Sequence, residues 1–138
     1  HVINYSTENF TQRVKEITGG KGVPVVFDSV GKSTWEGSLD CLQPRGMMVS
    51  FGNASGAVAP FSIGILAQKG SLFLTRPTLF SYTATPQDLA AAARDLFAVV
   101  KKKAVKISIN QTYPLSEAAQ AHRDLESRKT TGSTILVP

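Results

Sequence analysis

The stretch that decides the fold is Val23-Pro24-Val25-Val26-Phe27-Asp28-Ser29-Val30-Gly31. It is a near-continuous apolar run with a single acid close to its end, and such a run is typical of a strand that is covered on both faces of a parallel sheet. Met47 to Phe51 is a second strand of this kind, and Ser71 to Thr75 is a third. These runs predict an α/β fold with a parallel sheet.

Helical patterns separate these strands. Phe10, Val14 and Ile17 recur at helical intervals, after a cap at Ser6 or Thr7, and Gly19 and Gly20 stop this first helix. Ser33-Thr34-Trp35-Glu36 has the spacing of a capping box, and the helix that it begins continues through Leu39 and Leu42 to Pro44. With a short apolar piece at His1 to Tyr5 and a short helix over Ser62 to Gln68, the chain alternates strand and helix.

The second half of the chain begins with a strong helix signal. Thr85-Pro86-Gln87-Asp88 provides a cap, a proline at the first helical position and an acid in the first turn, and the helix ends in the lysines near residue 101. Lys106 to Tyr113 alternates as a strand with one wet face, Ser116 caps a helix through Arg128, and Ser133 to Val137 forms a closing strand. We expect residues 1–105 to form one domain and residues 106–138 to return to another.

Composition excludes several classes. With 42% hydrophobic and 18% charged residues the chain can bury a core, and no apolar run approaches the roughly 20 residues that span a bilayer. The net charge of +5 is scattered, with one lysine cluster, so nucleic acid is not an expected partner. One cysteine and two histidines predict neither a disulfide nor a metal site, and they favour the cytoplasm.

Ligands of open parallel sheets bind beyond the carboxyl ends of the strands. Three ends can be identified: Asp28 to Gly31, Phe51 to Gly56, and Thr75 to Thr78. Their glycines allow close approach, and their serine, asparagine and threonine side chains offer uncharged hydrogen bonds, as a flat heterocycle would need. The same residues also suit ordinary turns. No G-x-G-x-x-G lies between a strand and a helix, and Gly19 to Gly22 is a turn, so no loop for a pyrophosphate is present.

Six motifs occur in an order that resembles a known family: Asn4-Tyr5, Val26 to Gly31, Leu42 to Gly46, Val49 to Gly56, Thr75-Arg76-Pro77 and Tyr113 to Ala118. Together they resemble the C-terminal part of the NADPH-dependent quinone oxidoreductases, the zeta-crystallin-like, zinc-independent branch of the medium-chain dehydrogenase/reductase superfamily. The fold implied is the second half of a doubly wound, Rossmann-type nucleotide-binding domain, followed by a C-terminal segment of the catalytic domain. The implied activity is that of an oxidoreductase that reduces a quinone or enone with NADPH.

The resemblance also implies site residues. Tyr5 would border the adenosine end of NADPH, and Ser29 and Val30 would lie near its middle. Phe51, Gly52 and Asn53 would line the nicotinamide through backbone contacts. Thr78 and Leu79 would approach the same ring, and Arg128 would reach the cofactor from the other domain. No catalytic acid or base is expected, because the nicotinamide itself supplies the hydride.

Three further expectations follow. The family's glycine-rich loop and its catalytic domain would precede His1, so the chain alone should be inactive. Val2 to Tyr5, without its usual neighbouring strand, should be frayed or paired elsewhere than in a complete enzyme of the family. The exposed edge at Ser71 to Thr75 should pair with a second copy in a homodimer. The alternatives are a non-enzymatic nucleotide-binding or dimerisation module and another Rossmann-like enzyme such as a methyltransferase, which would carry its own glycine-rich loop.

Overall fold

A computed structural model describes all 138 residues, which form two compact units, His1–Tyr82 and Thr83–Pro138. The long helix that begins after Thr85 thus belongs to the second unit. The predicted boundary between residues 105 and 106 separates two domains of a longer enzyme of the family, and it stays a prediction.

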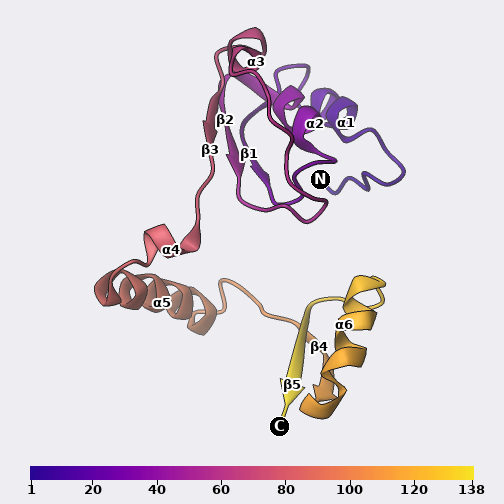
Figure 1. Ribbon diagram of the computed structural model, residues 1–138, viewed down its shortest axis with the longest axis vertical. Helices are drawn as coiled ribbons and strands as arrows, with labels where there is room; N and C mark the ends of the chain where they lie inside the picture. Colours follow the sequence, from indigo (N-terminus) through magenta and orange to yellow (C-terminus); the bar gives the residue numbers. More distant parts are fainter. The chain divides into compact units, whose positions relative to one another are not determined.

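The first unit contains a three-stranded sheet, and the three strands lie side by side in Figure 1. The strands are β1 (Val23–Asp28), β2 (Leu42–Ser50) and β3 (Phe73–Thr75), in the order β1-β2-β3. Both pairs are parallel, with Asp28 opposite Ser50 and Met48 opposite Leu74. The predicted α/β fold with a parallel sheet is confirmed.

Four helices accompany the sheet: α1 (Phe10–Ile17), α2 (Trp35–Asp40), α3 (Gly64–Gln68) and α4 (Leu79–Tyr82). The core lies between α2 and the sheet and contains Trp35, Leu39, Leu42, Met48 and Leu72. Parallel strands that follow one another in one direction are joined by right-handed crossovers, which place their helices on the same face. Within this unit the other face is therefore open, and Phe27 is 71% exposed, so the expectation that β1 is covered on both faces is not met there.

Two helix boundaries differ from the sequence prediction. The cap of α1 is Asn9, whose side chain accepts a hydrogen bond from the Gln12 N–H, and not Ser6 or Thr7. The second helix ends at Asp40, because Leu42 already pairs with Val23 in the sheet. The ladder is then interrupted and resumes where Val25 pairs with Met47.

The capping box at Ser33 to Glu36 does not form. Thr34 is the residue that precedes α2, but its side chain makes no cap hydrogen bond. Its hydroxyl donates to the carboxylate of Asp28 at 2.7 Å instead. The Thr34 hydroxyl is therefore used for a bond to the buried Asp28, and no side chain caps the start of α2.

The N-terminal segment Val2 to Tyr5 forms no strand, and Val2 is 99% exposed. The chain therefore has no strand at Val2 to Tyr5, while the fraying itself stays a prediction. Asn4 instead joins a turn: its N–H donates to the Glu8 carboxylate at 2.9 Å, and its carbonyl accepts from the Thr7 and Glu8 N–H groups.

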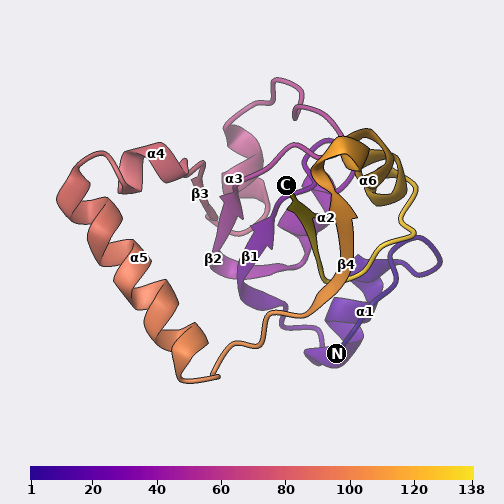
Figure 2. The ribbon, with the colours of Figure 1, turned by 90° about the horizontal axis from the view of Figure 1, so that it is seen from below.

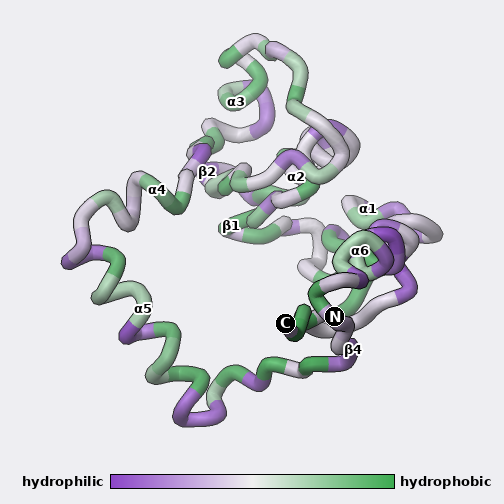
Figure 3. Tube along the Cα trace, turned by 60° about the horizontal axis from the view of Figure 1, so that its bottom comes forward, coloured by the Kyte–Doolittle hydropathy of each residue, from purple (hydrophilic) through white to green (hydrophobic).

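The second unit begins with α5 (Pro86–Lys101), where the Thr85 side chain accepts from the Asp88 N–H at 3.1 Å as predicted. Figure 3 shows hydrophobic and hydrophilic residues alternating in short runs along α5. β4 (Ile109–Pro114) pairs in parallel with β5 (Ser133–Val137), and α6 (Ala118–Glu126) packs beside β4 (Figure 2). Ser116 does not cap α6, because it lies in the short 3-10 helix Leu115–Glu117. No helix in the structure is both long enough and apolar enough to cross a membrane.

Candidate functional site

The carboxyl ends of the three parallel strands lie at one edge of the sheet. β1 ends at Asp28, β2 at Ser50 and β3 at Thr75, and the pairings Asp28–Ser50 and Val49–Thr75 place these ends in register. The loops that follow are residues 29–34, called the first loop here, and residues 51–56, called the second loop. The sheet topology therefore brings together segments that are more than 20 residues apart.

The two loops touch through their glycines. A Cβ atom added to Gly52 would lie 2.3 Å from the carbonyl oxygen of Ser29. One added to Gly31, which has a φ of +86°, would lie 2.8 Å from the carbonyl oxygen of Gly56. Both distances are far below van der Waals contact, so only glycine allows this approach of two backbones.

Backbone hydrogen bonds join the same loops. The Phe51 N–H donates to the Asp28 carbonyl at 2.9 Å, and the Ala54 and Ser55 N–H groups donate to the carbonyls of Ser29 and Val30 at 3.2 and 2.8 Å. The loops therefore form one ordered surface.

Asp28 is buried beneath this surface, with 4% of its area exposed. Burial acts to raise the pKa of its carboxyl group, but hydrogen bonds from the Gly31 N–H, the Ser38 and Thr34 hydroxyls and the Val30 N–H lower it. The net result is a pKa below the ordinary value, so Asp28 is a carboxylate at neutral pH. Because this carboxylate already occupies the N–H groups of Val30 and Gly31, the first loop is not a cradle for a phosphate.

Most of the predicted site residues of the first unit line hollows, whereas Gly52 lines none of them. Tyr5, Ser29 and Val30 line one hollow of about 200 Å³. Phe51, Thr78 and Leu79 line another of about 540 Å³. Neither set is contiguous in sequence, so the fold alone brings each together.

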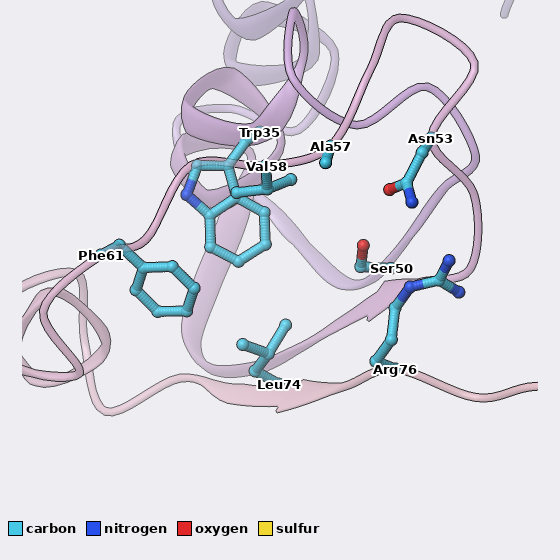
Figure 4. A pocket seen from close by; sticks show the side chains of 8 residues that line it. All are labelled: Trp35, Ser50, Asn53, Ala57, Val58, Phe61, Leu74 and Arg76. Carbon is cyan, nitrogen blue, oxygen red and sulfur yellow. The ribbon is translucent and has the colours of Figure 1, made fainter.

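Asn53 lines a third hollow, of about 280 Å³, which Figure 4 shows from close by. Asn53, Ser50 and Arg76 lie at its polar end, and Trp35 and Phe61 lie on the apolar side. The two aromatic rings are tilted at 43° with their centroids 4.8 Å apart. The shape suits a group with an apolar body and a polar tip.

Arg76 is the residue of this region that the sequence prediction left out of the site. It lines the hollows that contain Asn53 and Thr78, and one guanidinium nitrogen donates to the Pro77 carbonyl at 3.2 Å. Its position directly after β3, within a recognised motif, was the signal that could have identified it. Arg128 lies in the second unit, with a φ of +58°, two residues after α6 ends.

Two other reactive residue types lie away from these loops. Cys41 is buried, and burial raises the pKa of its thiol, so it is not a ready nucleophile. His122 is exposed and borders a small hollow of the second unit together with Leu125 and Leu136. In that unit the Tyr113 hydroxyl donates to Asp124 at 3.0 Å, and this bond raises the pKa of Tyr113.

The chain is similar to known proteins along nearly its whole length. The model of the zinc-binding dehydrogenase family matches residues 1–136. The chain is 58% identical to a quinone oxidoreductase of Pseudomonas aeruginosa and 48% identical to a 2-haloacrylate reductase of Burkholderia, covering 99% and 100% of this chain. It covers only 42% of each of these relatives.

A solved structure agrees with this similarity. A quinone oxidoreductase of Escherichia coli, crystallised in complex with NADPH, is 54% identical and superposes with a TM-score of 0.94 over all of this chain and 43% of its own length. The resemblance to quinone oxidoreductases, identified from six motifs, is thereby confirmed.

The family's name implies zinc, whose sites combine three or four Cys, His, Asp or Glu ligands. The side chains of this chain do not fit such a site, because no group of three of these residue types lies close enough to hold a metal ion. Because the family model nevertheless matches residues 1–136, this chain belongs to the zinc-binding dehydrogenase family.

Proposed function

We propose that the loops after β1, β2 and β3 hold the nicotinamide half of NADPH, in an enzyme that reduces a quinone or a related enone. The observation that carries this proposal is the direct contact between the first and second loops at Gly31 and Gly52, where no side chain lies between the two backbones. The similarity to an NADPH complex at 54% identity supports it. The length covered, about two fifths of the relatives, makes the activity a property of a longer protein.

The residues divide along the cofactor. Phe51, Gly52 and Asn53 face the nicotinamide, and Thr78 and Leu79 approach it from the loop after β3. Ser29 and Val30 contact the middle of the molecule, and Tyr5 contacts the adenosine end. Their separation into two hollows, one with Tyr5, Ser29 and Val30 and the other with Phe51, Thr78 and Leu79, supports this order. A contact of the cofactor with Arg128 is a separate prediction.

NADPH, when bound, supplies a hydride to the substrate, and a proton from solvent completes the two-electron reduction. What the chain's own residues do is to bind, to orient and to exclude water. No acid or base of the chain is assigned to the step, since the one acid at this edge, Asp28, is buried and fully hydrogen-bonded.

The experiment is a titration of the chain with NADPH, followed by nicotinamide fluorescence and by the fluorescence of Trp35. We expect a saturable change. Gly52→Ala should raise its midpoint at least about fivefold, a cost of about 1 kcal/mol, because a Cβ there would meet the Ser29 backbone and displace the loop that lines the nicotinamide. Gln87→Ala, in the exposed first turn of α5, is the matched control and should change nothing. A wild-type chain without a saturable signal would contradict the proposal and favour a non-enzymatic module.

A second candidate substrate is a halogenated acrylate, because one relative at 48% identity is a 2-haloacrylate reductase. Both substrates present a double bond activated by a carbonyl group, so the same hydride acceptor chemistry serves both. Loss of NADPH absorbance with 1,2-naphthoquinone but not with 2-chloroacrylate favours the quinone.

We also propose a homodimer that pairs Ser71 to Thr75 of two copies. β3 is the last strand of its sheet, and Phe73 is 58% exposed. No charge, proline or glycine protects this edge before Arg76.

The sole cysteine, Cys41, is buried and unpaired, which supports a reducing compartment, the cytoplasm.

Light scattering tests the dimer. The wild-type chain should have twice its mass of 14.8 kDa, and Phe73→Lys should have the mass of one chain. Ile63→Lys, at a residue that is 79% exposed before α3, is the matched control and should remain a dimer. A wild-type monomer, or a dimeric Phe73→Lys variant, would exclude this strand.

A further inference from the structure

Asp28 is the one charged residue that is buried in this structure. One carboxylate oxygen, Oδ1, accepts hydrogen bonds from the N–H groups of Val30 and Gly31 at 2.7 and 2.9 Å. The other, Oδ2, accepts from the hydroxyls of Thr34 and Ser38, both at 2.7 Å. A single side chain thus joins the end of β1, the first loop and α2.

The two oxygens of the carboxylate hold different parts of the chain: Oδ1 binds the backbone of the first loop, and Oδ2 binds the side chains of Thr34 and Ser38. In a planar trans peptide unit, the N–H and the preceding C=O point in opposite directions. Because the Val30 N–H points at Asp28, the Ser29 carbonyl points away from it, and there it accepts from the Ala54 N–H. In the same way the Gly31 N–H on Asp28 directs the Val30 carbonyl at the Ser55 N–H.

Oδ1 therefore sets two successive peptide planes, and each plane binds the second loop on its far side. The second loop carries Gly52 and Asn53. Neither residue donates a hydrogen bond to the Asp28 carboxylate. Asp28 is thus linked to the second loop through the backbone of the first loop.

We propose that Asp28 is the positioning residue of this edge: its Oδ1 orients the two peptide planes that hold the nicotinamide-facing second loop. The ligand part of this inference rests on the proposed function, whereas the orientation of the loops does not. Oδ2, bound to Thr34 and Ser38, fixes α2 to the sheet and is not needed for the second loop.

Amide hydrogen exchange separates these roles. Asp28→Leu keeps the branched shape without an acceptor, and it should speed exchange of the Ala54 and Ser55 amides at least tenfold while the amides of β2 change less than threefold. Asp28→Asn keeps an acceptor oxygen for the two N–H groups and should restore both rates to within threefold of wild type. If Asp28→Leu does not fold, Asp28→Ala, which has no side-chain acceptor either, replaces it.

Two controls accompany the variants. Asp40→Asn removes an exposed acid that pairs with Lys69, and it should leave every rate within twofold. The double variant Thr34→Val with Ser38→Ala removes the Oδ2 bonds and should leave Ala54 and Ser55 within threefold. Unchanged loop rates in Asp28→Leu overturn the proposal, and so does an equal acceleration of the β2 amides, because Asp28 would then serve only general stability.

NADPH titration completes the test. Asp28→Leu should raise the midpoint at least tenfold, and an unchanged midpoint overturns the positioning of the ligand site. If the wild-type chain gives no saturable signal while the exchange pattern holds, the proposed function is wrong and the orientation of the loops by Asp28 stands.

Discussion

At the scale of single residues, the site depends on Gly52, because a residue with a Cβ atom would not fit there. Gly52 lies so close to Ser29 that a Cβ would meet backbone, which cannot rotate away as a side chain can. We expect Gly52→Ala to lower the free energy of unfolding of the first unit by about 1–3 kcal/mol, the usual cost of forcing atoms into a packed region. Urea denaturation followed by Trp35 fluorescence measures this.

Gly64→Ala is the matched control. A Cβ at Gly64, in the first turn of α3, would come no nearer than 3.4 Å to Ser62 Oγ. Alanine is the better helix former, so this variant should be unchanged or more stable by up to about 1 kcal/mol. Equal stability of the two variants would show that the loops separate freely.

Asp28 should make the stability of the first unit depend on pH. Burial raises the pKa of this carboxyl, and its four hydrogen bonds outweigh burial, so the folded-state pKa lies below the unfolded value of about 3.9. A group whose folded pKa is depressed stabilises the fold above the unfolded pKa, and this contribution is lost as the pH falls through the folded pKa. The loss should therefore occur below about pH 4.

Urea denaturation between pH 2 and 6 checks this expectation. Asp28→Asn should show a weaker fall in unfolding free energy on acidification than wild type, whereas Asp40→Asn should follow wild type. The pKa of Asp124 is also lowered, but this residue stays in all three proteins, so the difference reports on Asp28. Parallel curves for wild type and Asp28→Asn would show that Asp28 does not titrate in this range.

At the scale of elements, α5 depends on a local signal. The Thr85 side chain accepts from the Asp88 N–H, and its hydroxyl also lies 2.7 Å from the Asp88 carboxylate. Thr85→Ala should weaken the start of α5 by about 1 kcal/mol. The expected readout is lower helicity in far-UV circular dichroism and faster amide exchange in the first turn. Gln87→Ala should lose no helicity, and an unchanged Thr85→Ala spectrum would mean that packing alone holds the helix.

The elements also show which signals a sequence carries. The start of α5 was predictable because cap, proline and acid lie within four residues and act on one another. The start of α2 was predicted to within a residue, but its capping box was not formed, because the Thr34 hydroxyl bonds to Asp28, a residue of the preceding strand whose proximity only the fold provides. Leu42 fits the helical interval of Trp35 and Leu39, yet pairing with Val23 places it in β2. Local patterns fail where a distant partner competes for the same side chain.

At the scale of the whole molecule, the sheet topology made the location of the site predictable, but not which of its residues lie together. The ends of parallel strands must meet at one edge, so the three loops could be located from three apolar runs. The grouping within that edge could not, because Phe51 and Thr78 share a hollow only through the register of β2 and β3. Arg76 could have been located at this edge from its position directly after β3, but only the folded loops show that it lines two of the hollows.

The last prediction concerns catalysis by the chain as it stands. Its 138 residues contain the loops for a nicotinamide but no G-x-G-x-x-G between a strand and a helix, and therefore no cradle for a pyrophosphate. Binding energy from remote parts of a cofactor is what holds the reacting carbon near its acceptor, and losing about 4 kcal/mol of it costs roughly a thousandfold in rate. We therefore expect kcat/KM for 1,2-naphthoquinone with NADPH at least about a thousandfold below that of a complete enzyme.

The complete quinone oxidoreductase of Escherichia coli, of which this chain covers 43%, is the reference for that measurement. A dimer formed through β3 would not restore the rate, because a second copy brings the same three loops and no pyrophosphate cradle. Mixing the chain with excess NADPH separates weak binding from poor positioning: if only affinity is lost, saturation recovers kcat, whereas lost positioning leaves kcat low. We expect the second result, and turnover within tenfold of the complete enzyme would show that the three strand-end loops suffice for hydride transfer.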